Sequence, residues 1–200
     1  MTDANKTGGI VMTEQLKEAL QEGEQLLWQG KPESFETLDK TYKQHLLTTT
    51  VISLAVAIII CVAYVAAAGA ANTKPLLILI ILLIACIGPF NSFSDGNKLR
   101  KMSYAITDRR ILALGEDVKG VELEKVDAAE FRKDADGHTS LLIGRDAVKS
   151  KPTKWRQYTV VGPHLTDEEN PVCETFALYA VKDIAGIRKA LAGRLDCLKG

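Results

Sequence analysis

Two long apolar stretches interrupt an otherwise polar chain. Residues 46–73 and 75–94 contain no Asp, Glu, Lys or Arg, and a helix needs about 20 mostly apolar residues to cross the hydrocarbon core of a membrane. We therefore expect transmembrane helices over 46–68 and 76–94. The alternative is a pair of buried helices in a soluble protein, which is less favoured because core helices seldom extend so far without a charged residue.

The segment between these stretches predicts how the two helices are connected. Residues 69–75 are mostly small or polar and end in Pro75, which lacks a backbone N–H and does not continue a helix. A link this short predicts an antiparallel hairpin with 69–75 as its external loop.

Basic residues predict the orientation of the hairpin, because Lys and Arg are enriched in cytoplasmic flanks. The link contains a single cation, Lys74. The outer flanks include Lys31, Lys40, Lys43, Lys98, Arg100, Lys101, Arg109 and Arg110. We therefore expect a multi-pass protein of the cytoplasmic (inner) membrane with both termini in the cytoplasm.

The polar parts of the chain lie before and after the two apolar stretches. Residues 1–22 predict a flexible arm with a short helix that begins after Thr13, and residues 23–45 predict a cytoplasmic segment that packs on the C-terminal domain. Residues 95–200 contain short apolar or alternating runs that are typical of strands. The elements expected there are strands over 102–106, 111–114, 121–131, 140–143, 155–161 and 173–180, and an amphipathic helix over 184–198 that Asp183 caps. Together they predict a membrane α+β protein with a small β-barrel or bent sheet and a C-terminal helix.

Two short motifs, one on either side of the hairpin, resemble those of a known family. Residues 23–32 read GEQLLWQGKP and residues 104–112 read YAITDRRIL, and their order is similar to that in the bacterial pleckstrin-homology-like (bPH) membrane proteins. The resemblance covers residues 22–198 and implies a cytoplasmic PH-like domain without a known reaction. An acidic insertion at 163–171 departs from the family's shorter connections. The motif residues are Gly23, Glu24, Trp28, Gly30, Pro32, Tyr104, Thr107, Asp108, Arg109 and Arg110.

Candidate chemistry changes this picture little. The chain has 25 basic and 25 acidic residues and a net charge of zero, which argues against a nucleic-acid partner. The common motifs for phosphate cradles, nucleophile elbows and zinc hydrolases do not occur. We therefore expect no enzymatic activity, no cofactor and no small-molecule substrate, with an enzyme of unusual type as the alternative.

A metal site is not expected either. The cysteines and histidines share no ligand spacing; they are Cys61, Cys86, Cys173, Cys197, His45, His138 and His164. Residues 134–137 resemble the start of a calcium loop, but Arg145 stands at the twelfth position, where the loop requires Glu. A hairpin turn is the better interpretation of 134–137.

One set of side chains remains as a candidate site. A cation close to an anionic leaflet gains about 1 kcal/mol, so a cluster of cations after the second helix could contact lipid headgroups, or else only set the topology and shape a turn. The function expected first is a membrane-anchored, non-catalytic PH-like interaction module that presents its cytoplasmic domain to a membrane protein partner or to copies of itself as a homo-oligomer. The alternative is anionic lipid-headgroup binding or sensing through the cluster, which comprises Lys98, Arg100, Lys101, Arg109 and Arg110.

Overall fold

The chain forms two compact units in a computed structural model that describes residues 14–33, 40–69, 72–162 and 175–199. One unit, called here the sheet unit, comprises Met1–Phe35 and Lys98–Gly200. The other, called the helix unit, comprises Glu36–Asn97. Thr13, the expected cap of the first helix, lies outside the described residues.

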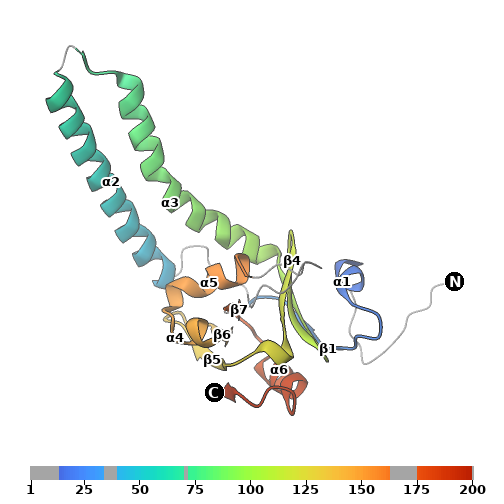
Figure 1. The fold of residues 1–200 in the computed structure, drawn as a ribbon. Coiled ribbons are helices and arrows are strands. Elements are labelled where there is room, and N and C mark those ends of the chain that lie inside the picture. Colours follow the sequence, from blue (N-terminus) through green and yellow to red (C-terminus); the bar gives the residue numbers. More distant parts are fainter. Residues whose placement is uncertain (1–13, 34–39, 70–71, 163–174, 200) are drawn as a thin grey trace. The chain divides into compact units, whose positions relative to one another are not determined.

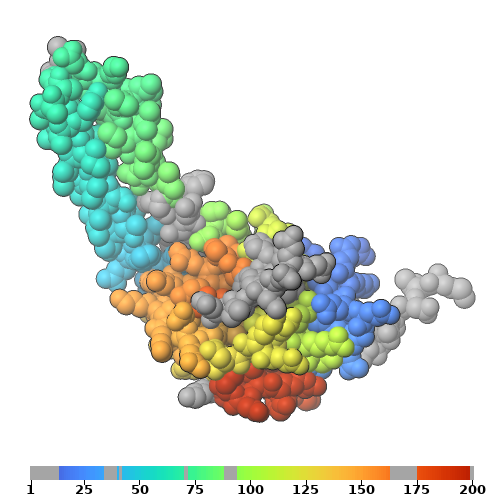
Figure 2. Space-filling model, viewed as in Figure 1, coloured from blue at the N-terminus to red at the C-terminus, as the bar shows by residue number. Residues whose placement is uncertain are grey.

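The helix unit contains two long helices that lie side by side (Figures 1 and 2). Helix α2 spans Lys40–Ala68 and α3 spans Pro75–Lys101, so α3 continues into the sheet unit at Lys98. Both helices are longer than the apolar stretches predicted. The polar flanks contain good helix formers, Lys40, Lys43 and Gln44 before one stretch and Lys98, Arg100 and Lys101 after the other, and the helices extend through them.

The outer surface of these helices is apolar. The segment Tyr42–Ala68 of α2 is long and apolar enough to cross a membrane, and Pro75–Ile87 is a shorter apolar segment of α3. Among the described residues, all exposed large hydrophobic side chains lie on α2 and α3, with the exception of Val161. The helix unit therefore exposes to its surroundings the residue types that the sheet unit buries.

The sheet unit contains two four-stranded sheets. The first has the order β1 (Leu26–Gly30), β2 (Ser103–Thr107), β3 (Arg110–Leu114) and β4 (Val118–Glu122), all antiparallel. The second has the order β7 (Phe176–Leu178), β6 (Thr139–Ile143), β5 (Ala129–Lys133) and β8 (Leu198–Lys199), in which only β8 runs parallel to its neighbour. Across the described strands the sheets stay separate and do not close into one barrel.

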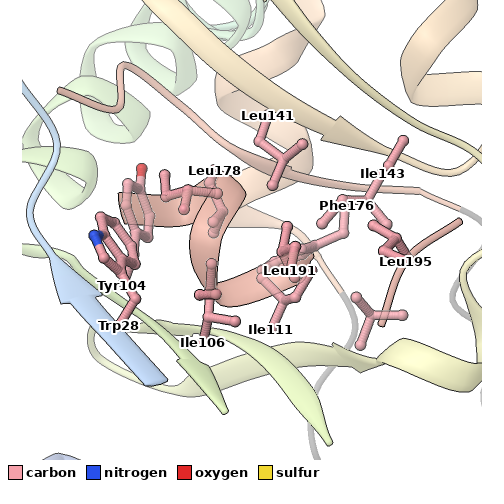
Figure 3. Packing of buried hydrophobic residues seen from close by; sticks show 14 of the residues in the cluster. Trp28, Tyr104, Ile106, Ile111, Leu141, Ile143, Phe176, Leu178, Leu191 and Leu195 are labelled. Atoms are coloured by element: carbon pink, nitrogen blue, oxygen red, sulfur yellow. The ribbon is translucent and has the colours of Figure 1, made fainter. Parts of the chain in front are cut away.

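The main core lies between the two sheets and takes one face of each (Figure 3). In β2 and β3 every second side chain points into it, and the same alternation recurs in β6 and β7, as the period of two in a strand requires. The ten residues labelled in Figure 3 are Trp28, Tyr104, Ile106, Ile111, Leu141, Ile143, Phe176, Leu178, Leu191 and Leu195.

The opposite face of each sheet is also covered, which explains why the central strands are buried along their whole length. Helix α1 (Glu14–Ala19) places Leu16 against Leu112 of the first sheet. Helices α4 (Arg145–Lys149) and α5 (Pro152–Val160) cover the second sheet, where Trp155 packs with Leu142.

The expected strand over 155–161 is wrong, because this segment is helix α5. Pro152 stands at the start of the helix, where its missing N–H costs nothing. The buried residues Trp155, Arg156, Thr159 and Val160 recur at intervals of one, three and one residue, which places them on one face of a helix. The expected strand over 121–131 is also divided, because a 3-10 turn, η2 (Leu123–Lys125), separates β4 from β5.

The C-terminal helix is shorter than expected. Helix α6 spans Ile184–Leu191 instead of 184–198, and its cap is confirmed, because the Asp183 carboxylate accepts a hydrogen bond from the Gly186 N–H (2.9 Å). Gly193 has φ +71°, a left-handed conformation that glycine adopts readily and that stops the helix. The apolar residues beyond it reach the core from a turn and from β8, not from the helix.

Candidate functional site

The family-like motifs meet around a buried ion pair. The Glu24 carboxylate accepts hydrogen bonds from Arg110 Nε (2.9 Å) and Thr107 Oγ1 (2.6 Å), and Arg110 Nη2 contacts its other oxygen. Arg110 Nη2 also donates to the Ala19 carbonyl at 3.0 Å. The Glu24 and Arg110 side chains are 0% and 6% exposed. Residues 86 positions apart in the sequence therefore join the end of α1, the start of β1 and the β2–β3 turn.

The turn between β2 and β3 is held by its own hydroxyl. Thr107 Oγ1 accepts hydrogen bonds from the N–H groups of Arg109 (3.2 Å) and Arg110 (2.8 Å). Asp108 fixes the turn to the chain before β1, because its carboxylate accepts from the Gln25 N–H (2.8 Å) while its own N–H donates to the Gln25 carbonyl (3.0 Å). These contacts explain why Thr, Asp and Arg stand together here.

The remaining motif residues link the first sheet to α6 and to the second sheet. Trp28 Nε1 donates to the Asp183 carboxylate at 3.0 Å, and a side chain on Gly30 would collide with the Trp28 ring. The Tyr104 hydroxyl donates to the Tyr179 carbonyl at 2.9 Å. Pro32 forms an isolated bridge with Val181. Gly23 has φ +78°, so it supplies the left-handed turn between α1 and β1.

Electrostatics of the motif follow from these contacts. Burial alone would raise the pKa of Glu24, but hydrogen bonds from Arg110, Thr107 and the Gln21 N–H, with the Arg110 charge, lower this pKa below its usual value. Hydrogen bonds from Gly186 and Trp28 lower the pKa of Asp183. Burial raises the pKa of the Tyr104 hydroxyl and keeps it protonated. These directions favour a charged Glu24 and a neutral Tyr104, and the hydrogen bonds of both groups serve packing.

A second buried polar chain was not anticipated from the sequence. The Tyr179 hydroxyl donates to the Asp134 carboxylate (3.0 Å) and accepts from Arg156 Nη2 (3.2 Å). The Arg156 guanidinium also lies over the Tyr179 ring, 5.1 Å from its centroid. The other Asp134 oxygen accepts from the N–H groups of Asp136 and His138, which confirms a hairpin turn at 134–137. This series of hydrogen bonds ties α5 to the β5–β6 turn and connects the buried Arg156 to the buried Asp134 through the Tyr179 hydroxyl.

The predicted basic cluster is divided into two parts. Lys98, Arg100 and Lys101 lie in the last turn of α3, before β2, and are exposed. Arg109 and Arg110 follow β2, at the opposite end of that strand. Arg109 is exposed, but Arg110 is buried against Glu24 and does not contribute to a surface. The five side chains therefore do not form one lipid-contacting face.

A small pocket of mixed charge lies at the end of α3. It has a volume of about 30 Å3, and Lys98 Nζ lies 3.7 Å from Glu116 Oε2 at its rim. The buried Lys119 side chain reaches the carbonyl of Val160 at the end of α5. The lining residues are Lys98, Lys101, Met102, Glu116, Asp117, Lys119 and Val160. Of the predicted site residues, only Lys98 and Lys101 line it.

Comparisons with protein-family models, with curated proteins and with solved structures find no match. The function of this chain is therefore argued from its own geometry.

The described residues contain no group of three or more His, Cys, Asp or Glu side chains placed to hold a metal ion. Cys61, Cys86 and Cys197 are free thiols, while Cys173 and His164 lie outside the described ranges. Two further hollows are described. One, of about 210 Å3, lies beside the β2–β3 turn and is lined by Arg109 among other residues. The other, of about 380 Å3, is an apolar groove between α2 and α3.

Proposed function

We propose that the chain is a non-catalytic interaction module with a PH-like fold, anchored in the cytoplasmic membrane by a hairpin of α2 and α3. Its sheet unit lies in the cytoplasm and presents a folded surface to a membrane protein partner or to a second copy of the chain. Both termini lie on the same side as the sheet unit.

The distribution of apolar surface carries this proposal. In water, contiguous exposed apolar surface of this extent is unfavourable, because about 25 cal/mol are lost for each Å2 of apolar surface left in water. On α2 and α3 large aliphatic side chains such as Ile59 (67% exposed) and Leu76 (66% exposed) point outward along the helices. Hydrocarbon is the environment in which this surface is stable.

The orientation and the fold name rest on further support. Cations gather at the start of α2 and the end of α3, whereas Lys74 stands alone between the helices, and this bias favours a cytoplasmic sheet unit. Two sheets and a helix near the C-terminus are the elements that the bPH resemblance implies, and the sheet unit contains them.

The non-catalytic part of the proposal is supported by how polar groups are used. The Glu24, Thr107 and Arg110 side chains of the motif bond to one another, and Tyr179 bonds to Asp134, so these buried polar groups serve the packing of the domain. A surface held so firmly suits recognition by a partner that needs a preformed shape.

A tagged full-length chain tests the proposal. Two copies with different affinity tags would be expressed together, cross-linked in the membrane, and purified in a mild detergent. We expect either the second tagged copy or one stoichiometric membrane protein, recovered in reciprocal purifications. Recovery of the monomer alone, with and without cross-linking, would contradict the interaction role.

Anionic lipid-headgroup binding remains the second candidate function, favoured by exposed Arg100 and Lys101 at the end of α3. The burial of Arg110 and the Lys98–Glu116 ion pair reduce the charge available for it. If the chain has this function, the full chain in nanodiscs should enrich anionic lipid, and the enrichment should decrease as salt is raised. An Arg100→Ala/Lys101→Ala variant should lose this enrichment. Equal recruitment by that variant would exclude it.

A further inference from the structure

The pocket at the end of α3 combines both signs of charge within a small space. Lys98 and Lys101 come from the helix, and Glu116 and Asp117 come from the turn between β3 and β4. Lys119 adds a third ammonium group from β4. A surface that bound only anions would have no use for two carboxylates beside its lysines, because these repel a negatively charged ligand.

One positive group of the pocket, the Lys119 ammonium, is fixed in place. Lys119 is 8% exposed, and its ammonium group is held by the Val160 carbonyl at the end of α5. Its position therefore does not depend on a flexible surface side chain. Met102, which is buried, supplies the apolar part of the same wall.

The rim of the pocket is adaptable. Lys98 Nζ and Glu116 Oε2 are 3.7 Å apart, beyond hydrogen-bond distance, and the two side chains are 43% and 67% exposed. An exposed pair of this kind contributes little to stability. A ligand that brings its own positive and negative groups can therefore separate the two side chains and pair with both.

We propose that this pocket binds the headgroup of a zwitterionic phospholipid that carries a primary ammonium group, as in phosphatidylethanolamine. The phosphate lies against Lys98 and Lys101, and the ammonium group donates hydrogen bonds to Glu116 and Asp117. The pocket, with a volume of about 30 Å3, has room for phosphate oxygens, because one water-sized group needs roughly 10–15 Å3. The rest of the headgroup lies on the rim.

The choice of headgroup follows from its chemistry. A primary ammonium group has three N–H donors for carboxylate oxygens. A quaternary choline group has none and is recognised by aromatic faces, and no aromatic residue is among the described residues that line this pocket. A headgroup with net negative charge has no cationic group of its own that could pair with the two carboxylates.

The source of the ligand follows from the helix, and here the inference rests on the proposed function. Lys98 and Lys101 lie on the same helix as the charge-free stretch 75–94, four and seven residues after Ser94, its last residue. A helix rises about 1.5 Å per residue, so these side chains follow a membrane-spanning segment at the level of the headgroups. Phospholipid is the phosphate ester most abundant at that level.

Short-chain lipids test the proposal on the purified full-length chain in detergent. Dihexanoyl phosphatidylethanolamine, phosphatidylcholine and phosphatidylglycerol would each be titrated by calorimetry. We expect the dissociation constant for phosphatidylethanolamine to be about two- to fivefold lower than for the other two, the ratio expected for exposed charge pairs. A Glu116→Gln/Asp117→Asn variant should lose this preference, and Lys98→Gln/Lys101→Gln should weaken binding of all three lipids.

A Glu122→Gln/Glu124→Gln variant is the matched control, because it removes the same charge from residues outside the pocket. It should keep the native preference. Equal affinity for phosphatidylcholine, tighter binding of phosphatidylglycerol, or an unchanged preference in the Glu116→Gln/Asp117→Asn variant would each overturn the proposal. Carbonate extraction of membranes separates the two failures: a chain retained in the pellet without lipid preference contradicts only this inference, whereas a chain released into the supernatant contradicts the anchor.

Discussion

The two units of this chain place the same apolar residue types differently: the sheet unit buries them and the helix unit exposes them. In the sheet unit, Leu, Ile and Phe side chains lie between the sheets. Charged groups lie at the surface or, where buried, form hydrogen bonds with other side chains or with carbonyl groups. In the helix unit, Leu, Ile and Val side chains point outward along both helices. The difference teaches that burial pattern, and not overall composition, distinguishes the two units. A chain with zero net charge and ordinary composition contains one unit that buries its large apolar side chains and one that exposes them.

The largest effect is expected from charges placed on the helix unit. Ile59→Arg combined with Ile84→Arg replaces two exposed side chains near the middle of α2 and α3, and each Arg costs about 2.5–3.5 kcal/mol at the centre of a membrane helix. The variant should be lost from carbonate-washed membranes. Val161→Arg is the control, because Val161 is 73% exposed in the sheet unit, and it should stay in the membrane fraction. Equal retention of both variants would remove the contrast between the units.

The next largest effect is expected at the buried ion pair. Arg110→Ala leaves the Glu24 carboxylate buried without its charged partner, which typically costs about 3–5 kcal/mol. Urea unfolding followed by the fluorescence of Trp28 and Trp155, both in the sheet unit, measures this loss in the full chain. The variant Glu24→Gln/Arg110→Met should recover part of it, because no unpaired charge remains. A small effect of Arg110→Ala would show that water reaches the pair.

The same pair gives the sheet unit a dependence on pH. The pKa of Glu24 is lowered in the folded state, so its contribution is complete above the unfolded pKa of about 4.5 and is lost as the pH falls through the lower folded value. As the pH is lowered through this acid range, the urea concentration at the unfolding midpoint of the native chain should decrease. It should fall less in Glu24→Gln/Arg110→Met, and parallel curves for the two proteins would contradict this assignment.

A smaller effect is expected at the second polar chain. Tyr179→Phe removes the hydroxyl that donates a hydrogen bond to Asp134 and accepts one from Arg156. The substitution should lower the free energy of unfolding of the sheet unit by about 1–3 kcal/mol. Tyr158→Phe, on the same helix as Arg156, is the control, because Tyr158 is only partly buried. If both substitutions had the same effect in urea unfolding, the hydrogen bonds that connect Asp134, Tyr179 and Arg156 would not stabilise the sheet unit more than an ordinary contact.

The smallest effect is expected from Asp183→Ala, which removes both the cap of α6 and the partner of Trp28 Nε1. Amide hydrogen exchange should become faster at the start of α6 with little change in the two sheets. Faster exchange throughout both sheets would show that Asp183 stabilises the whole unit instead of one helix end.

Local patterns in the sequence were sufficient for much of the fold. The apolar stretches, the strands β2 and β3, the turn at 134–137 and the Asp183 cap each depend on neighbouring residues and were predicted. Helix α5 was missed because its aromatic and β-branched residues, Trp155 and Tyr158–Val160, are types enriched in strands, and packing against the second sheet favours the helix. Helix α6 was extended too far because the apolar positions after Gly193 keep a helical spacing although the backbone turns there.

The candidate site was harder to predict because it depends on contacts between distant residues. The spacing of basic residues suggested one cluster of five, yet Arg110 is drawn inward by Glu24, 86 positions earlier. Glu116 and Asp117 stood in a turn without any motif, and only the fold places them beside Lys98 and Lys101. A one-residue signal did exist for Arg110, since an Arg in a turn between two buried strands requires a partner.

The central claim is that α2 and α3 form a membrane hairpin with the sheet unit on the cytoplasmic side. Single-cysteine variants Asn72→Cys and Lys189→Cys, in a chain without its native cysteines, test it most directly, because both positions are exposed and lie in different units. A membrane-impermeant maleimide applied to intact bacterial cells should label Asn72→Cys and should label Lys189→Cys only after the membrane is opened. Labelling of Lys189→Cys in sealed cells, or protection of Asn72→Cys, would contradict the account.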